Sequence, residues 1–177
     1  MSAARLLRRA AQVGVLAALL GSCEETIPGE LVGAYQITMR IDDNGCGMGA
    51  LPLPDGHRYA AELRAEGERG YWRVPRAAPM DGRYDEDERS FRFSYATALE
   101  LGNADAGTAG CRVLREETLT GEIDARREED TLLGEHVISF RTDPSGRCAD
   151  VRGPLGPFVA LPCEARYAVE GTPRDPF

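Results

Sequence analysis

The sequence predicts an all-β domain, an antiparallel barrel or sandwich of seven to eight strands, after a helical signal peptide. Apolar and polar residues alternate over short runs, which is the period of a strand with one buried face. Segments rich in glycine, proline and aspartate separate these runs at regular spacing. No run after the first 22 residues has the length and period of a long helix.

The strongest alternation covers residues 31–41 and predicts a half-buried strand. One face of this strand carries Leu31, Gly33, Tyr35, Ile37, Met39 and Ile41. Residues 42–45 end it, and the glycine- and proline-rich segment 45–56 is predicted to be a loop that carries Cys46. Residues 58–65 predict a second strand, and residues 70–75 a short aromatic strand that Pro75 and Pro79 interrupt or place at an edge.

Two later stretches resemble each other and predict two hairpins of the same construction. In the first, residues 82–85 precede a charged turn and a returning strand over 89–96. In the second, residues 121–124 precede a charged turn and a returning strand over 131–141. Residues 161–169 predict the last strand, and residues 171–177 a short tail. Such a meander of strands favours a barrel or a sandwich.

The first 22 residues have the layout of an export signal. Arg5, Arg8 and Arg9 form a positive segment, and residues 10–21 are apolar apart from Gln12. This apolar run is shorter than the roughly 20 residues that a membrane-spanning helix needs. An exported protein is therefore expected.

The end of this segment, Leu20-Gly21-Ser22-Cys23, resembles the lipobox of bacterial lipoproteins. The resemblance implies cleavage before Cys23, a diacylglycerol on its thiol and an acyl chain, such as palmitate, on its new amine. The alternative is an ordinary secretory signal cut after Cys23. Glu24 follows the cysteine, and the absence of aspartate there favours the outer membrane by resemblance to enterobacterial sorting.

This interpretation divides the chain into a signal peptide (1–22), a lipidated cysteine with a short tether (23–30), a β-rich domain (31–170) and a tail (171–177). The formal net charge is −8, and it becomes −11 without the signal peptide, which contains three arginines and no acidic residue. Such an acidic surface repels nucleic acid and anionic lipid headgroups. We therefore expect no nucleic-acid partner.

Four cysteines remain once Cys23 carries lipid, namely Cys46, Cys111, Cys148 and Cys163. Four cysteines in an exported domain are typical of two disulfides. A plain meander favours Cys111–Cys148 with Cys46–Cys163, and Cys148–Cys163 with Cys46–Cys111 is nearly as good. The sequence does not decide among the three pairings. No two cysteines have the Cys-x-x-Cys spacing, so no metal or other cofactor is expected.

The chain contains no recognisable catalytic motif. A Gly-x-Ser-x-Gly segment is absent. His136 and Ser139 lie three residues apart on a predicted strand, so they point to opposite faces and cannot pair as base and nucleophile. His57 lies in a predicted turn with no partner in view. The acidic clusters 85–88 and 128–130 are typical of solvated hairpin tips.

The segment Gly33-Ala34-Tyr35 resembles the Gly-x-Trp opening of lipocalins and other calycin barrels, with tyrosine in place of tryptophan. That resemblance implies a cavity for a small apolar ligand. Its candidate lining is aromatic: Tyr35, Tyr59, Trp72, Phe91, Phe93 and Tyr95. The alternative is that these side chains fill the core.

Three functions follow as expectations. The first is a non-catalytic envelope lipoprotein, structural or protein-binding, held to the membrane by its lipid anchor. The second is a calycin-like carrier of a small hydrophobic ligand, and the third is a hydrolase. An open aromatic cavity would favour the carrier, and a filled core with exposed apolar residues would favour the protein-binding module. A contact between histidine and an acidic residue in a cleft would favour the enzyme.

Overall fold

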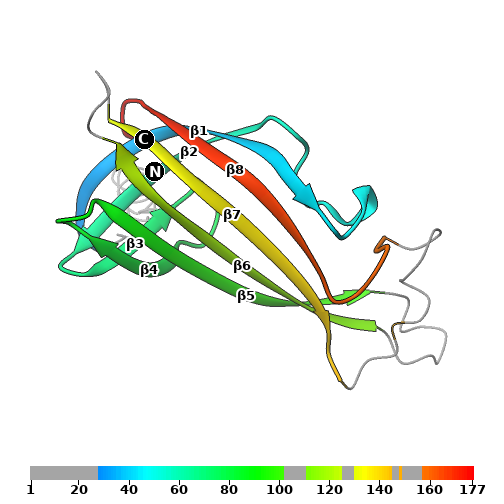
Figure 1. Cartoon of the computed structure of the whole chain (residues 1–177). Coiled ribbons are helices and arrows are strands. Elements are labelled where there is room, and N and C mark those ends of the chain that lie inside the picture. The colour runs from blue at the N-terminus through cyan, green and yellow to red at the C-terminus, as the bar shows by residue number, and fades with distance from the viewer. Residues whose placement is uncertain (1–27, 102–110, 125–129, 145–147, 149–156) are drawn as a thin grey trace, which may run out of the picture.

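The computed structural model of the chain describes residues 28–101, 111–124, 130–144, 148 and 157–177. Within these residues, eight antiparallel strands form a closed barrel in chain order, and the last strand pairs with the first (Figure 1). The predicted all-β antiparallel fold is confirmed, and the architecture is a barrel. Cys23 and residues 1–22 lie outside the described residues.

The observed strands fall where the alternation predicts them and are mostly longer. They are β1 (Glu30–Asn44), β2 (His57–Glu66), β3 (Arg69–Arg73), β4 (Met80–Asp85), β5 (Ser90–Leu101), β6 (Cys111–Asp124), β7 (Thr131–Thr142) and β8 (Cys163–Pro173). A single turn of 3-10 helix, η3 (Met48–Ala50), lies in the loop after β1. Both predicted hairpins are present, as β4–β5 and β6–β7.

Leu31 departs from the alternation of β1. The prediction places it on the buried face, but its side chain is 40% exposed. A β-bulge between Leu31 and Gly33 inserts Val32 as an extra residue, and such an insertion shifts the side chains before it to the other face. From Gly33 onward the predicted face does point inward, with Tyr35, Ile37 and Met39 buried.

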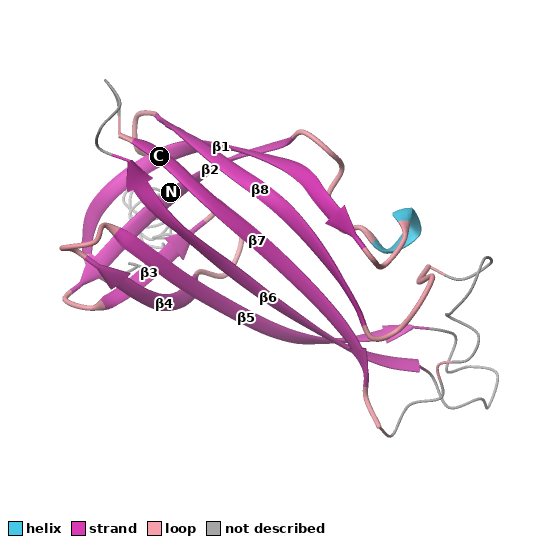
Figure 2. Ribbon diagram, in the orientation of Figure 1, coloured by secondary structure: helices cyan, strands magenta, loops and turns pink. Residues whose placement is uncertain are grey.

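The barrel has two unlike ends. At the turn end, β1 begins and short turns join β2 to β3 and β4 to β5. At the loop end, β1 finishes, β8 begins and the longer connection 45–56 lies (Figure 2). The two ends are thus distinguished by connection length.

One side of the barrel wall is incomplete toward the loop end. β4 pairs only with the first part of β5, from Ser90 to Phe93. Within the described part of the chain, residues 94–101 of β5 have no strand on that side, although β6 pairs with them on the other. Figure 1 shows β3 and β4 beside one half of β5 only. We call this gap the open side.

The interior is filled by large side chains. Trp72 stacks on Phe91 with ring centroids 6.0 Å apart, and Phe91 stacks on Phe93 at 5.5 Å. Near the loop end, Phe140 packs against Phe158 with ring centroids 5.1 Å apart. Aromatic pairs at these separations add roughly 0.5–1.5 kcal/mol to the stabilisation from buried area.

The C-terminal residues pack on the outside of the barrel. Gly171 to Pro173 continue β8, and the N–H of Phe177 donates a hydrogen bond of 3.1 Å to Glu62 of β2. The same carboxylate accepts a bond of 3.1 Å from Arg73, whose guanidinium lies over the Phe177 ring. Glu62 is only 1% exposed, so these bonds compensate for the burial of its charge.

Candidate functional site

The six aromatic residues that the sequence predicts as a cavity lining do not share one environment in the structure. Tyr35, Trp72, Phe91 and Phe93 are buried, and the last three stack on one another, so they fill the core. Tyr59 is partly buried, and Tyr95 is 46% exposed. The filled interior favours the core-filling alternative for the four buried residues.

Gly33 and Tyr35, which carry the resemblance to calycin barrels, are in close contact. A Cβ atom at position 33 would collide with the Tyr35 hydroxyl, so only glycine fits under this ring. The eight-stranded antiparallel barrel is consistent with the architecture that the resemblance implies.

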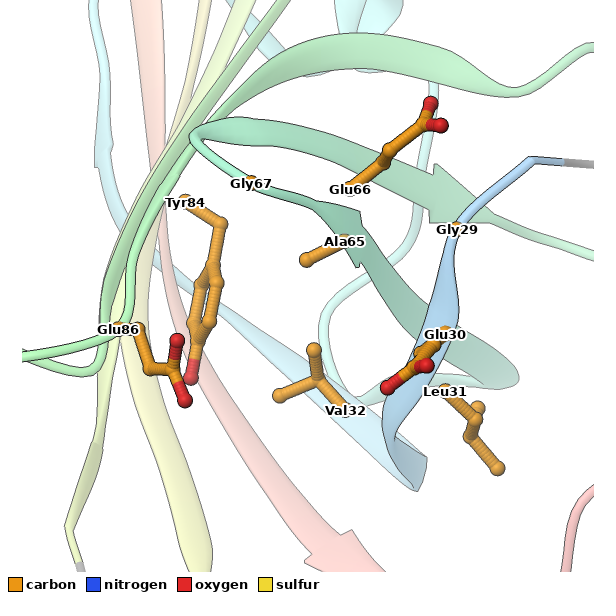
Figure 3. Close-up of a pocket in the computed structure, with 9 residues that line it drawn as sticks. All are labelled: Gly29, Glu30, Leu31, Val32, Ala65, Glu66, Gly67, Tyr84 and Glu86. Atoms are coloured by element: carbon orange, nitrogen blue, oxygen red, sulfur yellow. The ribbon is translucent and has the colours of Figure 1, made fainter.

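A shallow pocket of about 650 Å³ lies at the turn end (Figure 3). Its residues come from the start of β1, the β2–β3 turn and the β4–β5 hairpin, and include Glu30, Glu66 and Glu86 beside Val32 and Tyr84. Three carboxylates around so open a pocket disfavour both an anionic and an apolar ligand. This pocket does not provide the cavity that a carrier of apolar molecules requires.

Both disulfides lie at the loop end. Cys46, just after β1, is bonded to Cys163 at the start of β8, and Cys111, at the start of β6, is bonded to Cys148. This is the first of the pairings that the meander favours. Two disulfides indicate that the protein matures in an oxidising, exported compartment.

Met48 and Val159 are the most exposed large apolar residues among those described, at 77% and 67%. They belong to adjacent loops, since a Cβ atom at Gly47 would meet the Val159 side chain. Val159 donates its N–H to the carbonyl of Cys46 at 2.9 Å, and Asn44 Oδ1 accepts N–H bonds from Cys46 and Gly47. We call Met48 and Val159 the loop-end patch.

A second candidate is a group of charged side chains inside the barrel. Arg115 and Glu117 occupy inward positions of β6, and His136 an inward position of β7. One guanidinium nitrogen of Arg115 lies 2.9 Å from Glu117 Oε1, and His136 Nε2 lies 3.0 Å from Glu117 Oε2. We call these three residues the interior cluster.

Two of the nominated aromatics, Tyr95 and Tyr59, lie near the interior cluster. Tyr95 on β5 is directly opposite Glu117 in the strand register. Burial and the nearby Glu117 carboxylate, opposed by a hydrogen bond from Trp72, together raise the pKa of Tyr59 to about 12. The sequence therefore nominated the neighbours of the cluster but missed Arg115 and Glu117.

The interior cluster has a defined charge state. Burial by itself raises the pKa of Glu117, but the contact with His136 and the charge of Arg115 outweigh it. The pKa of this carboxyl therefore lies below its usual value, and Glu117 is ionised at neutral pH. The charges of Arg115 and Glu117 then cancel each other.

A nucleophile next to a base is not assembled at this cluster. His136 points inward, whereas Ser139 lies near Glu164, with Oγ and Oε2 3.3 Å apart. Among the described residues, none forms a hydrogen bond of normal geometry with either ring nitrogen of His136. His57 stacks on Tyr59, with ring centroids 5.7 Å apart.

The acidic hairpin tips are engaged in local bonds where they are described. Asp85 accepts the N–H of Glu88 at 3.0 Å, and Asp130 pairs with Arg89 at 2.7 Å. Residues 128 and 129 lie outside the described residues. In the described ranges, no three histidine, cysteine or acidic side chains are grouped so that they could hold a metal ion.

The described residues also contain no helix that is long and apolar enough to cross a membrane. No protein-family model, curated protein or solved structure matches the chain.

Proposed function

We propose that the chain is an envelope lipoprotein, anchored through Cys23, that binds a partner protein with its loop end. The lipobox-like segment and the export signal support the anchor, and the disulfides agree with an exported compartment. Glu24 after the cysteine favours the outer membrane.

The observation that carries this proposal is that the exposed apolar patch and both disulfides occupy the same end of the barrel. Exposed apolar side chains lower solubility, so a pair of them on a surface held by disulfides favours an interaction site. The backbone bonds around Cys46 already hold the patch in place. Less entropy is lost on binding when a surface is fixed in advance.

The position of the anchor indicates which way the loop-end patch faces relative to the membrane. β1 begins at the turn end, and Cys23 precedes it by a segment that extends at most about 25 Å. The turn end is therefore the end nearest the membrane. β6 has 14 residues, and strands of this length tilted in a barrel span roughly 30 Å. The loop-end patch would face away from the lipid, toward proteins of the envelope.

Co-purification from cross-linked membranes tests the partner. The double variant Met48→Glu/Val159→Glu puts charges on the patch without touching the core, and Leu31→Glu is its matched control at the turn end. We expect one partner to co-purify with the wild type and with Leu31→Glu, and to be lost from the double variant. Equal recovery from all three proteins would contradict the proposal.

Fractionation tests the anchor separately. Two or more acyl chains hold a protein stably on a membrane, because each buried CH₂ contributes about 0.8 kcal/mol. Cys23→Ser should leave an uncleaved precursor or a soluble protein. A variant that fractionates and migrates like the wild type would disprove the anchor. The loop-end interaction would still be tested by the co-purification experiment.

A further inference from the structure

Solvent reaches the barrel interior through the open side. Tyr95 belongs to the inward face of β5, in line with the buried residues Phe91 and Phe93, yet it is 46% exposed. The reason is that β4 pairs with β5 only as far as Phe93. Arg115 and Glu117, on the adjacent strand, keep 22% and 13% of their side chains exposed. A ligand entering here would meet the tyrosine ring first and the interior cluster behind it.

The interior cluster contains buried polar atoms that are not satisfied. His136 is only 7% exposed, and while its Nε2 lies 3.0 Å from Glu117 Oε2, its Nδ1 makes no hydrogen bond within the described part of the chain. The same holds for Nε of Arg115. Most buried polar atoms in proteins have a partner, and an exception points to a ligand or to a functional role. Among the described strands, Arg115 lies on β6, next to the part of β5 that pairs with no strand on its other side.

The charges of the cluster define the ligand that would fit. Glu117 neutralises Arg115 at 2.9 Å, so this pair offers no net positive charge to an anionic ligand. Arg115 Nε can only donate, whereas an imidazole nitrogen such as His136 Nδ1 either donates or accepts. A hydroxyl group both donates and accepts hydrogen bonds. A ligand with several hydroxyls can therefore bond to both Arg115 Nε and His136.

The exposed ring of Tyr95 adds an apolar platform next to these polar atoms. A pyranose ring has an apolar C–H face that packs on an aromatic ring through dispersion contacts, and its hydroxyls project from the edge. We propose that the open side of the barrel, built from Tyr95, Arg115 and His136, binds a neutral saccharide. This site is distinct from the loop-end patch and does not depend on the partner proposed above.

The protein contains a single tryptophan, which reports on this site. Trp72 is buried beside Phe91 and Phe93 and forms a hydrogen bond with Tyr59, a residue that interacts electrostatically with Glu117. Binding should therefore change its fluorescence. The full-length protein, purified from membranes in detergent, is first screened on an array of neutral glycans. Those that bind, with chitotriose and maltotriose as defined probes, are then titrated against Trp72 fluorescence.

Two pairs of variants separate binding from folding. Tyr95→Ser removes the ring, and Tyr95→Phe keeps it. Because Tyr95 is exposed, both variants should fold, and the serine variant should bind roughly three- to tenfold more weakly. Arg115→Gln should weaken binding roughly tenfold or more, whereas Arg141→Gln, on the exposed outer face, should have no effect.

The expected result is saturable binding of at least one neutral glycan. Binding should be weakened by Tyr95→Ser and Arg115→Gln and retained by Arg141→Gln. The absence of any bound glycan on the array would overturn the proposal. Binding that Tyr95→Ser leaves unchanged would also overturn it, because the ligand would then lie elsewhere. Preferential binding of sulfated or phosphorylated glycans on a matched array would contradict the assignment of a neutral ligand.

Discussion

The backbone N–H of Val159 donates a hydrogen bond of 2.9 Å to the carbonyl oxygen of Cys46, and this bond joins two loops that are distant in sequence. The disulfide between Cys46 and Cys163 closes the same junction covalently. Val159 is nevertheless exposed. The loop end therefore combines a fixed backbone with an apolar side chain that nothing in the described chain covers.

The two disulfides should contribute unequally to stability. In the chain-entropy model, the loop of sequence separation 37 closed by Cys111–Cys148 gives about 4 kcal/mol, and the loop of separation 117 closed by Cys46–Cys163 about 5 kcal/mol. Replacing each pair by serine should lower the free energy of unfolding by these amounts. Urea denaturation without reductant measures them, and a loss below about 1 kcal/mol for both pairs would contradict the prediction.

Tyr59 should make the protein sensitive to alkali. Its pKa is raised from 10.0 to about 12 in the folded state, mainly by burial. The unfolded chain loses this proton first, so stability is unaffected below about pH 10 and falls as the pH rises toward 12. Tyr59→Phe should remove up to about 3 kcal/mol of that loss. The measurement is urea denaturation at several alkaline pH values, and an unchanged pH profile would argue against the burial of this hydroxyl.

Glu117 should make the stability of the protein sensitive to acid. Burial raises its folded-state pKa, but His136 and Arg115 outweigh burial and lower it, so its contribution to stability is present above its ordinary pKa of 4.5 and is lost as the pH falls through the folded-state pKa. Glu117→Gln should flatten the acid limb of the stability profile and destabilise the protein at neutral pH. Glu116→Gln is the control, since this residue lies in an exposed pair worth less than about 1 kcal/mol. Identical profiles for the two variants would contradict the interior cluster.

The C-terminal tail should stabilise the barrel through Glu62. Its carboxylate accepts bonds from Arg73 and from the N–H of Phe177 in a buried position. Glu62→Ala removes both bonds, and because the Arg73 side chain keeps 24% of its surface in solvent, the change should cost roughly 1–3 kcal/mol. Deletion of residues 174–177 keeps the Arg73 bond and should cost less. Thermal unfolding compares the two variants. A deletion that destabilises the protein more than Glu62→Ala does would contradict the prediction.

The sequence predicts most of the fold because strand alternation is a local signal. It places β1 correctly from Gly33 onward but fails at Leu31, since the bulge at Val32 depends on the pairing with β2. The contact of Phe177 with Glu62 has no local signal, because the two residues are 115 positions apart. Residues 171–177, expected to be a tail, are partly strand and partly a packed terminus for the same reason.

The interior cluster is different, because a signal for it does exist in the sequence. Arg115 and Glu117 share the strand parity of Val113 and Leu119, both buried. Two charged residues at inward positions are unusual enough to mark a site. Their contact with His136 still required the register of β6 against β7, which turn composition alone does not define.

The most direct test of the central claim is photo-cross-linking in living cells from position 159, with position 86 as the control at the turn end. Glu86 lines the turn-end pocket and is exposed, so both probes reach solvent. The account predicts one discrete adduct with another envelope protein from position 159, absent from position 86 and abolished by Met48→Glu. Adducts of equal pattern from both positions, or none from position 159, would contradict it.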